Sequence, residues 1–332
     1  MLPYSLTTYG FPHRMGYLAT RDGVKYPRPF SIPQLLDEVK RFDLHGIDMP
    51  LPDPAVLPDE ALIDLLAERD LRITVEFMAL PDVSEEAAAT MVRRAAAVGA
   101  KVMRTLISTV LCGDRRPLPE GWEARLAVMA ERLKAILPIA ADLGIALAVE
   151  NHQDATTDDL LLLHSMTDYH PAYGITLDTG NPLAVGEEPV QAARRLAPLI
   201  RHLHLKDYTI HYAPQGYRLV RCAAGDGVID FPAILSAVRD NGFPYLLPGI
   251  EIAAQPTRTI PILDRGWWDG YPSTPTTDLI GALRILWEKG RPQDAPYSSA
   301  WERGENSEVV GAEEWDIVTR SVAYFAGLTG HA

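Results

Sequence analysis

The chain has 332 residues, of which 47% are hydrophobic and 23% are charged, a composition typical of globular proteins. Its 44 acidic and 31 basic residues give a net charge of −13, which disfavours binding to nucleic acid or to an anionic membrane. The two cysteines, Cys112 and Cys222, are too few for a disulfide framework and suit a reducing cytosol, so we expect a cytoplasmic protein. The first residues lack the pattern of a signal peptide, and no apolar run reaches the ~18 residues of a membrane span.

Strand-like and helix-like segments alternate along the chain. The strand-like segments are 5–10, 46–50, 73–79, 102–107, 146–152, 173–179, 200–206 and 245–252. The helix-like segments are 31–44, 58–70, 84–98, 121–142, 156–168, 187–198, 230–241 and 277–289. Ser31, Ser84 and Asp230 are predicted to cap three of these helices. Eight strands that alternate with eight helices predict a (β/α)8 barrel. An open doubly wound sheet is the alternative, but it would need a glycine-rich loop where the chain reads YGFPHRMG.

Three connections that follow predicted strands are long, at 108–120, 207–229 and 253–276. The active sites of barrels are built from the loops after the strands, so we expect these loops to shape a substrate pocket. Ordinary surface insertion is the alternative for each of them.

The end of the chain does not continue the repeat. We predict that residues 1–289 form the barrel and that 290–332 are an extension, with a helix at about 313–327, that packs on the barrel or on a partner subunit. The last quarter also contains five tryptophans, which we expect to be covered by protein because aromatic side chains this dense are seldom left in water. They are Trp267, Trp268, Trp287, Trp301 and Trp315.

Four of the later strands end in a residue type that binds metals. The runs LAVENH, GITLDTGN, RHLHLKD and LPGIEI place large aliphatic side chains on one face of each strand. The other face carries Glu150, Asp178, His204 and Glu251, one on each of strands five to eight. Three carboxylates and an imidazole suit Mn²⁺, Mg²⁺ or Co²⁺ better than a structural zinc, so we predict a divalent metal site, with Mn²⁺ as the first candidate. For any one of these acids, the alternative is an interior charge satisfied by a neighbour.

Other polar residues share the predicted mouth of the barrel. His152 and Lys206 each lie two residues beyond a predicted ligand, on the same face. His152 is a candidate proton carrier, with a hydrogen-bonded loop histidine as the alternative. Lys206 can neutralise a substrate oxygen, with an ion pair to Asp207 or another acid as the alternative. Glu76 on strand three is expected to pair with Arg104 on strand four, or to hold a substrate hydroxyl.

His202 has the inward parity of His204 but lies one layer deeper in the predicted barrel. We therefore interpret it as a packed core histidine, not as a ligand.

The segments AVENH, LDTGN, HLHLKD with GDGVIDFPAIL, and GIEI resemble the sugar phosphate isomerase/epimerase family, which has a xylose isomerase-like barrel. The resemblance extends over about residues 30–255. It implies a divalent metal held by Glu150, Asp178, His204 and Glu251, and in the ketose epimerases of the family the two glutamates also form the acid/base pair. Ketose 3-epimerases carry a histidine soon after the strand-six aspartate, where this chain has Asn181, and the GWWDGYP segment lies outside the small epimerase pattern.

We therefore predict a metal-dependent sugar isomerase or epimerase that forms an enediolate on a ketose or oxo-sugar. The predicted catalytic residues are Glu150, Glu251 and His152. The predicted substrate-binding residues are Lys206, Glu76, Arg104 and Asn181. We expect a small-molecule sugar partner and a homo-oligomer. A lyase is the alternative on the same site, as a 3-oxo-sugar-acid decarboxylase, a dehydratase or a C-glycoside deglycosidase subunit. More remote alternatives are an apurinic endonuclease and a sugar-binding barrel without turnover.

Overall fold

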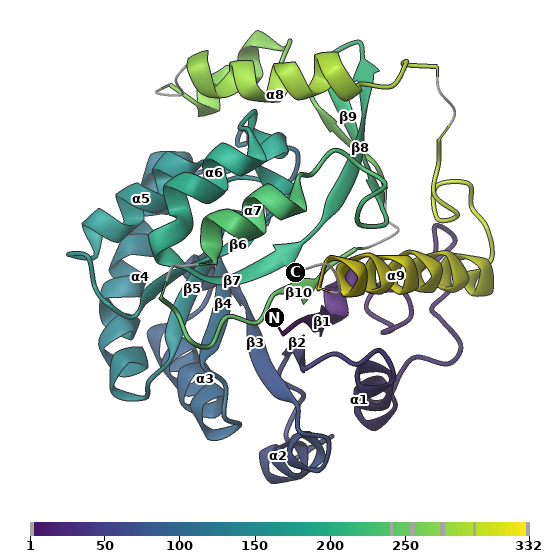
Figure 1. Cartoon of the computed structure of the whole chain (residues 1–332). Coiled ribbons are helices and arrows are strands. Elements are labelled where there is room, and N and C mark those ends of the chain that lie inside the picture. The colour runs from purple at the N-terminus through teal and green to yellow at the C-terminus, as the bar shows by residue number, and fades with distance from the viewer. Residues whose placement is uncertain (1–2, 240–241, 253–255, 273–275, 295–296, 330–332) are drawn as a thin grey trace.

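The predicted barrel is present in the computed structural model, which describes residues 3–239, 242–252, 256–272, 276–294 and 297–329. Among these residues, eight parallel strands close in the order β1-β10-β7-β6-β5-β4-β3-β2, with helices around them (Figure 1). The strands are β1 (Ser5–Thr7), β2 (Gly46–Pro50), β3 (Arg72–Ala79), β4 (Val102–Leu106), β5 (Ala146–Glu150), β6 (Tyr173–Asp178), β7 (Ile200–Leu205) and β10 (Gly249–Ile250).

The helices between the strands begin close to the predicted positions. They are α1 (Ile32–Arg41), α2 (Asp59–Glu68), α3 (Glu85–Ala97), α4 (Trp122–Asp142), α5 (Thr157–Met166), α6 (Pro189–Leu196) and α7 (Phe231–Val238). The predicted caps at Ser31, Ser84 and Asp230 are confirmed, because each side chain accepts a hydrogen bond from a backbone N–H in the first turn. The last two residues of the predicted helix 230–241 lie outside the described residues.

The two faces of the barrel strands have different chemistry. Large aliphatic side chains such as Leu147, Val149 and Ile175 are fully buried in the main hydrophobic core. Val102, Ala146 and Ala148 have the other parity and form a small separate cluster. Because these side chains are small and the next inward positions are polar, the strand ends can hold charged groups inside the barrel.

A second sheet corrects the prediction that 207–229 and 253–276 are loops. β8 (Asp207–Ala213), β9 (Gly216–Cys222) and β11 (Arg258–Ile260) form an antiparallel sheet in the order β11-β9-β8. β8 follows β7 after one residue and extends beyond the barrel toward α8 (Thr276–Lys289) (Figure 1). The segment 253–276 also contains a 3-10 helix, η5 (Arg265–Gly270). The residues directly after β7, and some of those after β10, therefore form regular secondary structure.

The Asp207 carboxylate fixes the turn that follows this hairpin. Its Oδ1 accepts hydrogen bonds from the backbone N–H groups of Tyr208 (2.8 Å) and Ile229 (3.1 Å). Its Oδ2 accepts from Gly225 (2.9 Å) and Gly227 (3.1 Å). A Cβ at Gly227 would lie 2.1 Å from Oδ1, so only glycine fits at this position.

We expect Asp207→Ala to lower the free energy of unfolding by about 2–4 kcal/mol, because a lost acceptor leaves buried N–H groups unpaired. Gly227→Ala should act in the same direction by displacing the carboxylate. Urea unfolding followed by circular dichroism measures both variants. Asp226→Ala is the control in the same turn: it removes only an exposed ion pair with Arg320 and should cost less than about 1 kcal/mol. Equal effects of Asp207→Ala and Asp226→Ala would contradict the anchoring role of Asp207.

The C-terminal helix α9 (Ser307–Thr329) packs against the beginning of the chain. The ring of Phe325 lies 5.2 Å from that of Tyr4, and the ring of Trp315 lies 5.4 Å from that of Phe11. The buried Glu314 carboxylate accepts hydrogen bonds from the backbone N–H of His13 and of Arg14, both at 3.1 Å. The helix thus closes one side of the barrel with both apolar and polar contacts.

The expectation that all five late tryptophans are covered is wrong for one of them. Trp267 is fully buried, and Trp268, Trp301 and Trp315 are partly buried. Trp287 on α8 is 82% exposed because it lies on the side of the helix away from the sheet.

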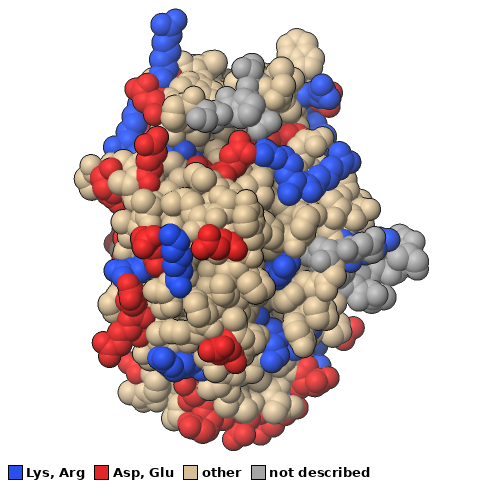
Figure 2. Space-filling model, turned by 90° about the vertical axis from the view of Figure 1, so that its left-hand side faces the viewer, with Lys and Arg blue, Asp and Glu red and all other residues tan. Residues whose placement is uncertain are grey.

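The surface of the protein carries mixed charge. On the face drawn in Figure 2, acidic side chains gather toward the lower edge, and acidic and basic side chains alternate over the rest. Within the described part of the chain, no helix combines the length and the apolar character needed to cross a lipid bilayer.

Candidate active site

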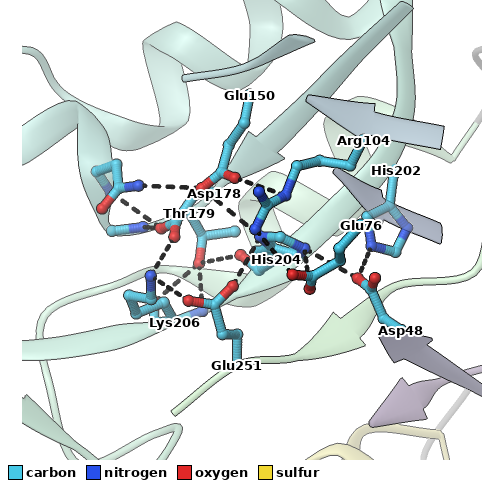
Figure 3. Close-up of polar contacts among 12 residues, drawn as sticks. Asp48, Glu76, Arg104, Glu150, Asp178, Thr179, His202, His204, Lys206 and Glu251 are labelled. Atoms are coloured by element: carbon cyan, nitrogen blue, oxygen red, sulfur yellow. Dashed lines mark hydrogen bonds and ion pairs between the residues drawn. The ribbon is translucent and has the colours of Figure 1, made fainter. Parts of the chain in front are cut away.

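The four predicted metal ligands converge at the carboxyl ends of their strands (Figure 3). Glu150 and Asp178 are the last residues of β5 and β6, His204 lies in β7, and Glu251 directly follows β10. Ligand atoms of Glu150, Asp178 and His204 all lie within 4.8 Å of one another, and all three side chains are buried. Oε2 of Glu251 lies 2.7 Å from Nδ1 of His204, which brings the fourth side chain to the same point.

Several polar atoms at this point lack hydrogen bonds. Oε2 of Glu150, Nδ1 of His204 and Oε2 of Glu251 are buried without a hydrogen-bond partner among the described residues. Nδ1 of His204 and Oε2 of Glu251 nevertheless lie only 2.7 Å apart. Oε2 of Glu150 forms an ion pair with Arg104 at 3.0 Å, so these atoms are not isolated, but a cation between them would satisfy all three. The donor set, mainly carboxylate oxygens with one imidazole nitrogen, suits a hard divalent ion such as Mn²⁺ or Mg²⁺.

The balance of charge in the cluster also fits a cation. The described cluster holds five carboxylates and two basic side chains that pair with them, Arg104 and Lys206. The five acids are Asp48, Glu76, Glu150, Asp178 and Glu251. An excess of buried negative charge is stable only with a counter-ion or bound protons. The residues present therefore fit a divalent metal ion.

The pKa values of the predicted ligands reflect burial and the closeness of these charged groups. Burial alone would raise the pKa of Glu150, but Arg104 and His204 lower it to about 2. Burial lowers the pKa of His204, but the carboxylates of Glu251 and Glu150 outweigh it and raise the pKa well above the usual value. Burial raises the pKa of Asp178, and Lys206 opposes that shift. Without a metal ion, both ring nitrogens of His204 would therefore carry a proton, and the positive charge of the ring would balance part of the negative charge of the cluster.

Lys206 reaches into the cluster from the end of β7. Its Nζ lies 2.5 Å from Oδ2 of Asp178 and 2.7 Å from Oε1 of Glu251. The ion pair that the sequence offered as the alternative is therefore formed with these two acids and not with Asp207, whose carboxylate faces the backbone N–H groups of the turn at 225–229. The ammonium group therefore lies among the predicted ligands, where it can face a substrate oxygen.

Arg104 links two acids on neighbouring strands. Its Nη2 lies 3.0 Å from Oε2 of Glu76, which is the ion pair expected from the sequence, and its Nε lies 3.0 Å from Oε2 of Glu150. Burial raises the pKa of Glu76 well above its ordinary value, although Arg104 opposes the shift. The ring of Tyr9, which follows β1, lies 5.9 Å from the guanidinium carbon of Arg104. Tyr9 is a residue of this site that the sequence did not reveal.

Asn181 and His152 lie beside the ligands. Nδ2 of Asn181 lies 3.5 Å from Oε1 of Glu150, and the backbone N–H of Asn181 donates to Oδ1 of Asp178 at 3.1 Å. Nδ1 of His152 is buried and has no hydrogen-bond partner among the described residues. Burial lowers the pKa of His152 to about 4, so its imidazole is neutral at neutral pH and can accept a hydrogen bond or a proton.

Asp48 on β2 was not identified from the sequence, but it contacts the ligand histidine (Figure 3). Its Oδ2 lies 2.6 Å from Nε2 of His202 and 2.9 Å from Nε2 of His204. His202 is fully buried, as expected, and its ring is held by this carboxylate below the level of His204. A carboxylate that accepts from one nitrogen of a histidine leaves the other nitrogen available to a metal.

Comparison with known proteins agrees with this architecture. A family model described as a xylose isomerase-like TIM barrel matches residues 36–264, and the chain belongs to this family. A 3-oxo-isoapionate decarboxylase from Pectobacterium atrosepticum is 32% identical over 113 residues, which cover 33% of this chain and 40% of that protein. An inosose dehydratase from Clostridium botulinum is 30% identical over 149 residues, which cover 41% of this chain and 49% of that protein. The similarity thus spans less than half the length of these relatives.

Solved structures show the same fold at low sequence identity. A xylose isomerase-like TIM barrel protein from Mycobacterium smegmatis, in complex with magnesium, has a TM-score of 0.57 and 18% identity. The match covers 86% of this chain and 98% of that one. An L-ribulose 3-epimerase has a TM-score of 0.57 and 16% identity, with 86% of this chain and 93% of that one covered. At this identity, the likeness extends to the fold alone.

Proposed function

We propose that this protein is a divalent-metal-dependent isomerase or epimerase that acts on a ketose or oxo-sugar through an enediolate. The observation that carries the proposal is the convergence of the buried side chains of Glu150, Asp178, His204 and Glu251 at the barrel mouth. Mn²⁺ is the first candidate for the metal, and Mg²⁺ or Co²⁺ are the alternatives. The magnesium in the Mycobacterium smegmatis relative supports a hard divalent ion in this fold.

A bound divalent ion would polarise the substrate carbonyl and stabilise the charge of an enediolate. Glu150 and Glu251 both reach Nδ1 of His204, at 3.6 and 2.7 Å, from strands on different parts of the barrel. Burial raises the pKa of Glu251, but Lys206 and His204 outweigh it and keep the pKa well below the usual value, so Glu251 is ionised and can accept a proton. With a substrate carbon between the two carboxylates, one of them can remove a proton from one face of that carbon and the other can return a proton to the opposite face.

The other predicted residues would bind and orient the sugar. The Lys206 ammonium would compensate negative charge that develops on a substrate oxygen. Arg104 holds Glu76 and Glu150 in place, and Glu76 and Asn181 offer polar atoms without hydrogen bonds to sugar hydroxyls. His152 would exchange a proton with a hydroxyl from its unpartnered Nδ1.

A lyase is the second candidate, and the names of the curated relatives favour it. They are a 3-oxo-isoapionate decarboxylase and an inosose dehydratase. The chemistry is closely related, because a stabilised enediolate can also form when CO₂ leaves, or can lose water, from a position next to the carbonyl. The replacement of the epimerase histidine by Asn181 fits this candidate as well.

The proposal is tested by incubating the Mn²⁺-loaded protein with ketoses, 3-oxo sugars and oxo-sugar acids in D₂O and following the products by NMR. Deuterium incorporation without fragmentation is expected for an isomerase or epimerase, whereas release of CO₂ or water would establish the lyase. Asp178→Asn and chelator-treated protein are the controls, and both should be inactive. If no substrate shows metal-dependent exchange or loss of a group, the proposed function is wrong.

A further inference from the structure

Two arginines lie on one face of the antiparallel sheet that extends from β7. In the register of the sheet, Arg221 on β9 is opposite Tyr208 on β8, and Arg258 on β11 is opposite Leu219 on β9. Leu219 and Arg221 are two residues apart, so both arginines project from the same face. Most of their neighbours on that face are fully or almost fully buried, whereas Tyr212, near the hairpin turn, is 39% exposed. The buried ones are Tyr208, Ile210, Tyr217, Leu219 and Ile260. The arginines therefore point into the protein.

This face adjoins the loop that follows β6. A Cβ at Gly180 would lie 2.4 Å from a ring carbon of Tyr208, so the Tyr208 ring packs directly on the Gly180 backbone. The N–H of Gly180 in turn donates to Oδ1 of Asp178 at 2.9 Å. Arg221, which hydrogen-bonds the Tyr208 side chain, interacts electrostatically with Asp178 and Glu251. Arg221 thus lies on the face of the sheet that packs on the loop after Asp178.

Arg258 adjoins the loop that follows β5. It interacts electrostatically with Cys112 and with Arg221. The N–H of Cys112 donates to Oε1 of Gln153 at 3.1 Å, and Gln153 directly follows His152. The face that carries the two arginines therefore adjoins the loop that carries Asn181, and Arg258 is near Cys112, which bonds the loop that carries His152.

Arg258 has little to balance its charge. Its Nε is buried without a hydrogen-bond partner, and no acid among the described residues lies within ion-pair distance of it. Glu302 is an acid that interacts electrostatically with Arg258. Its carboxylate, however, accepts hydrogen bonds from the backbone N–H and the hydroxyl of Thr257, both at 3.0 Å. Burial and the like charge of Arg221 lower the pKa of Arg258. A guanidinium group that is partly buried near a like charge is costly unless an anion is added beside it, and that is the situation of Arg258.

On the basis of the proposed function, we propose that Arg221 and Arg258 bind an anionic group of the substrate, so that the substrate is a sugar acid or a sugar phosphate. Guanidinium groups match carboxylate and phosphate oxygens with paired hydrogen bonds. Without the two guanidinium groups, the acids at the barrel mouth would repel an anionic sugar. A neutral ketose would leave Arg258 without a counter-charge.

The test measures binding by calorimetry, at constant ionic strength, to the Mn²⁺-loaded protein and to Arg258→Gln and Arg221→Lys variants. The probes are D-gluconate, its neutral counterpart D-glucitol, and inorganic phosphate. We expect Arg258→Gln to weaken the binding of an anionic probe by about ten-fold or more and to leave that of D-glucitol unchanged. Loss of D-gluconate binding in the variants identifies a carboxylate as the anionic group of the substrate. Loss of phosphate binding alone identifies a phosphate as that group.

Arg218→Gln is the matched control, because Arg218 lies on β9 with the opposite parity, so its side chain leaves the sheet on the other face. It removes the same charge as Arg258→Gln from the neighbouring strand of the same sheet, and it should bind all probes as the wild type does. Equal affinity of the wild type for D-gluconate and D-glucitol, with no binding of phosphate, would overturn the proposal. So would unchanged affinity for both anions in Arg258→Gln and Arg221→Lys. Binding requires no turnover, so this result is independent of the exchange assay in D₂O, which tests the proposed function.

Discussion

Glu251→Gln is expected to lower kcat by about 10²–10⁴, the contribution typical of a general acid or base, while the barrel remains folded. The Glu251 carboxylate lies 2.7 Å from Nδ1 of His204 and 2.7 Å from Nζ of Lys206. An amide has the same size and still offers an oxygen to these neighbours, but it cannot accept a proton from a substrate carbon. Steady-state kinetics on the substrate found by the exchange assay measure the effect, and circular dichroism checks the fold.

Loss of the metal ion must be separated from loss of the base. Metal content is therefore measured in Glu251→Gln, and kcat is measured again with excess Mn²⁺. Glu131→Gln is the control, since Glu131 is an exposed residue that pairs only with Lys134 on the surface, and it should retain full activity. Wild-type kcat in Glu251→Gln would remove Glu251 from the mechanism. Recovery of kcat with excess Mn²⁺ would restrict its role to metal binding.

The parts of the fold that follow from local patterns were predictable. The strand 46–50 and the helix starts at Ser31 and Ser84 depend on alternation and on capping side chains, which are visible within a few residues. The gathering of Glu150, Asp178 and His204 follows from parity alone, because neighbouring parallel strands in a barrel bring their carboxyl ends together.

Features that depend on distant pairing were not predictable. β11 pairs with β9, which lies far away in the sequence, and the three residues of β11 carry no strong strand signal of their own. Asp48 is another example: it is an isolated acid in the run GIDMP, and only closure of the barrel places β2 opposite β7 and brings Asp48 to His204. The exposure of Trp287 was not predictable for the same reason, because it depends on which side of α8 packs against the rest of the protein.

Asp48→Asn is expected to weaken Mn²⁺ binding by about 10–100-fold, as is usual when the carboxylate that orients a metal-binding histidine is removed. Oδ2 of Asp48 can accept from Nε2 of His204 only when that nitrogen carries a proton, so in the neutral imidazole that binds a metal Nδ1 keeps its lone pair toward Glu150 and Glu251. An asparagine of the same size can present its N–H₂ group instead, which would favour the opposite tautomer. Titration with Mn²⁺, followed by calorimetry or by electron paramagnetic resonance of free Mn²⁺, measures the affinity.

A general loss of stability would also weaken metal binding, so the comparison needs a second buried aspartate. Asp154→Asn makes the same exchange at a fully buried residue that bonds Ser108 and does not contact His204. It should bind Mn²⁺ as the wild type does, even if its melting temperature falls. Unchanged affinity in Asp48→Asn, or an equal loss in both variants, would show that Asp48 does not orient the ligand. A loss in Asp48→Asn alone would mean that this carboxylate orients His204, because Asp154 is equally buried but does not contact that imidazole.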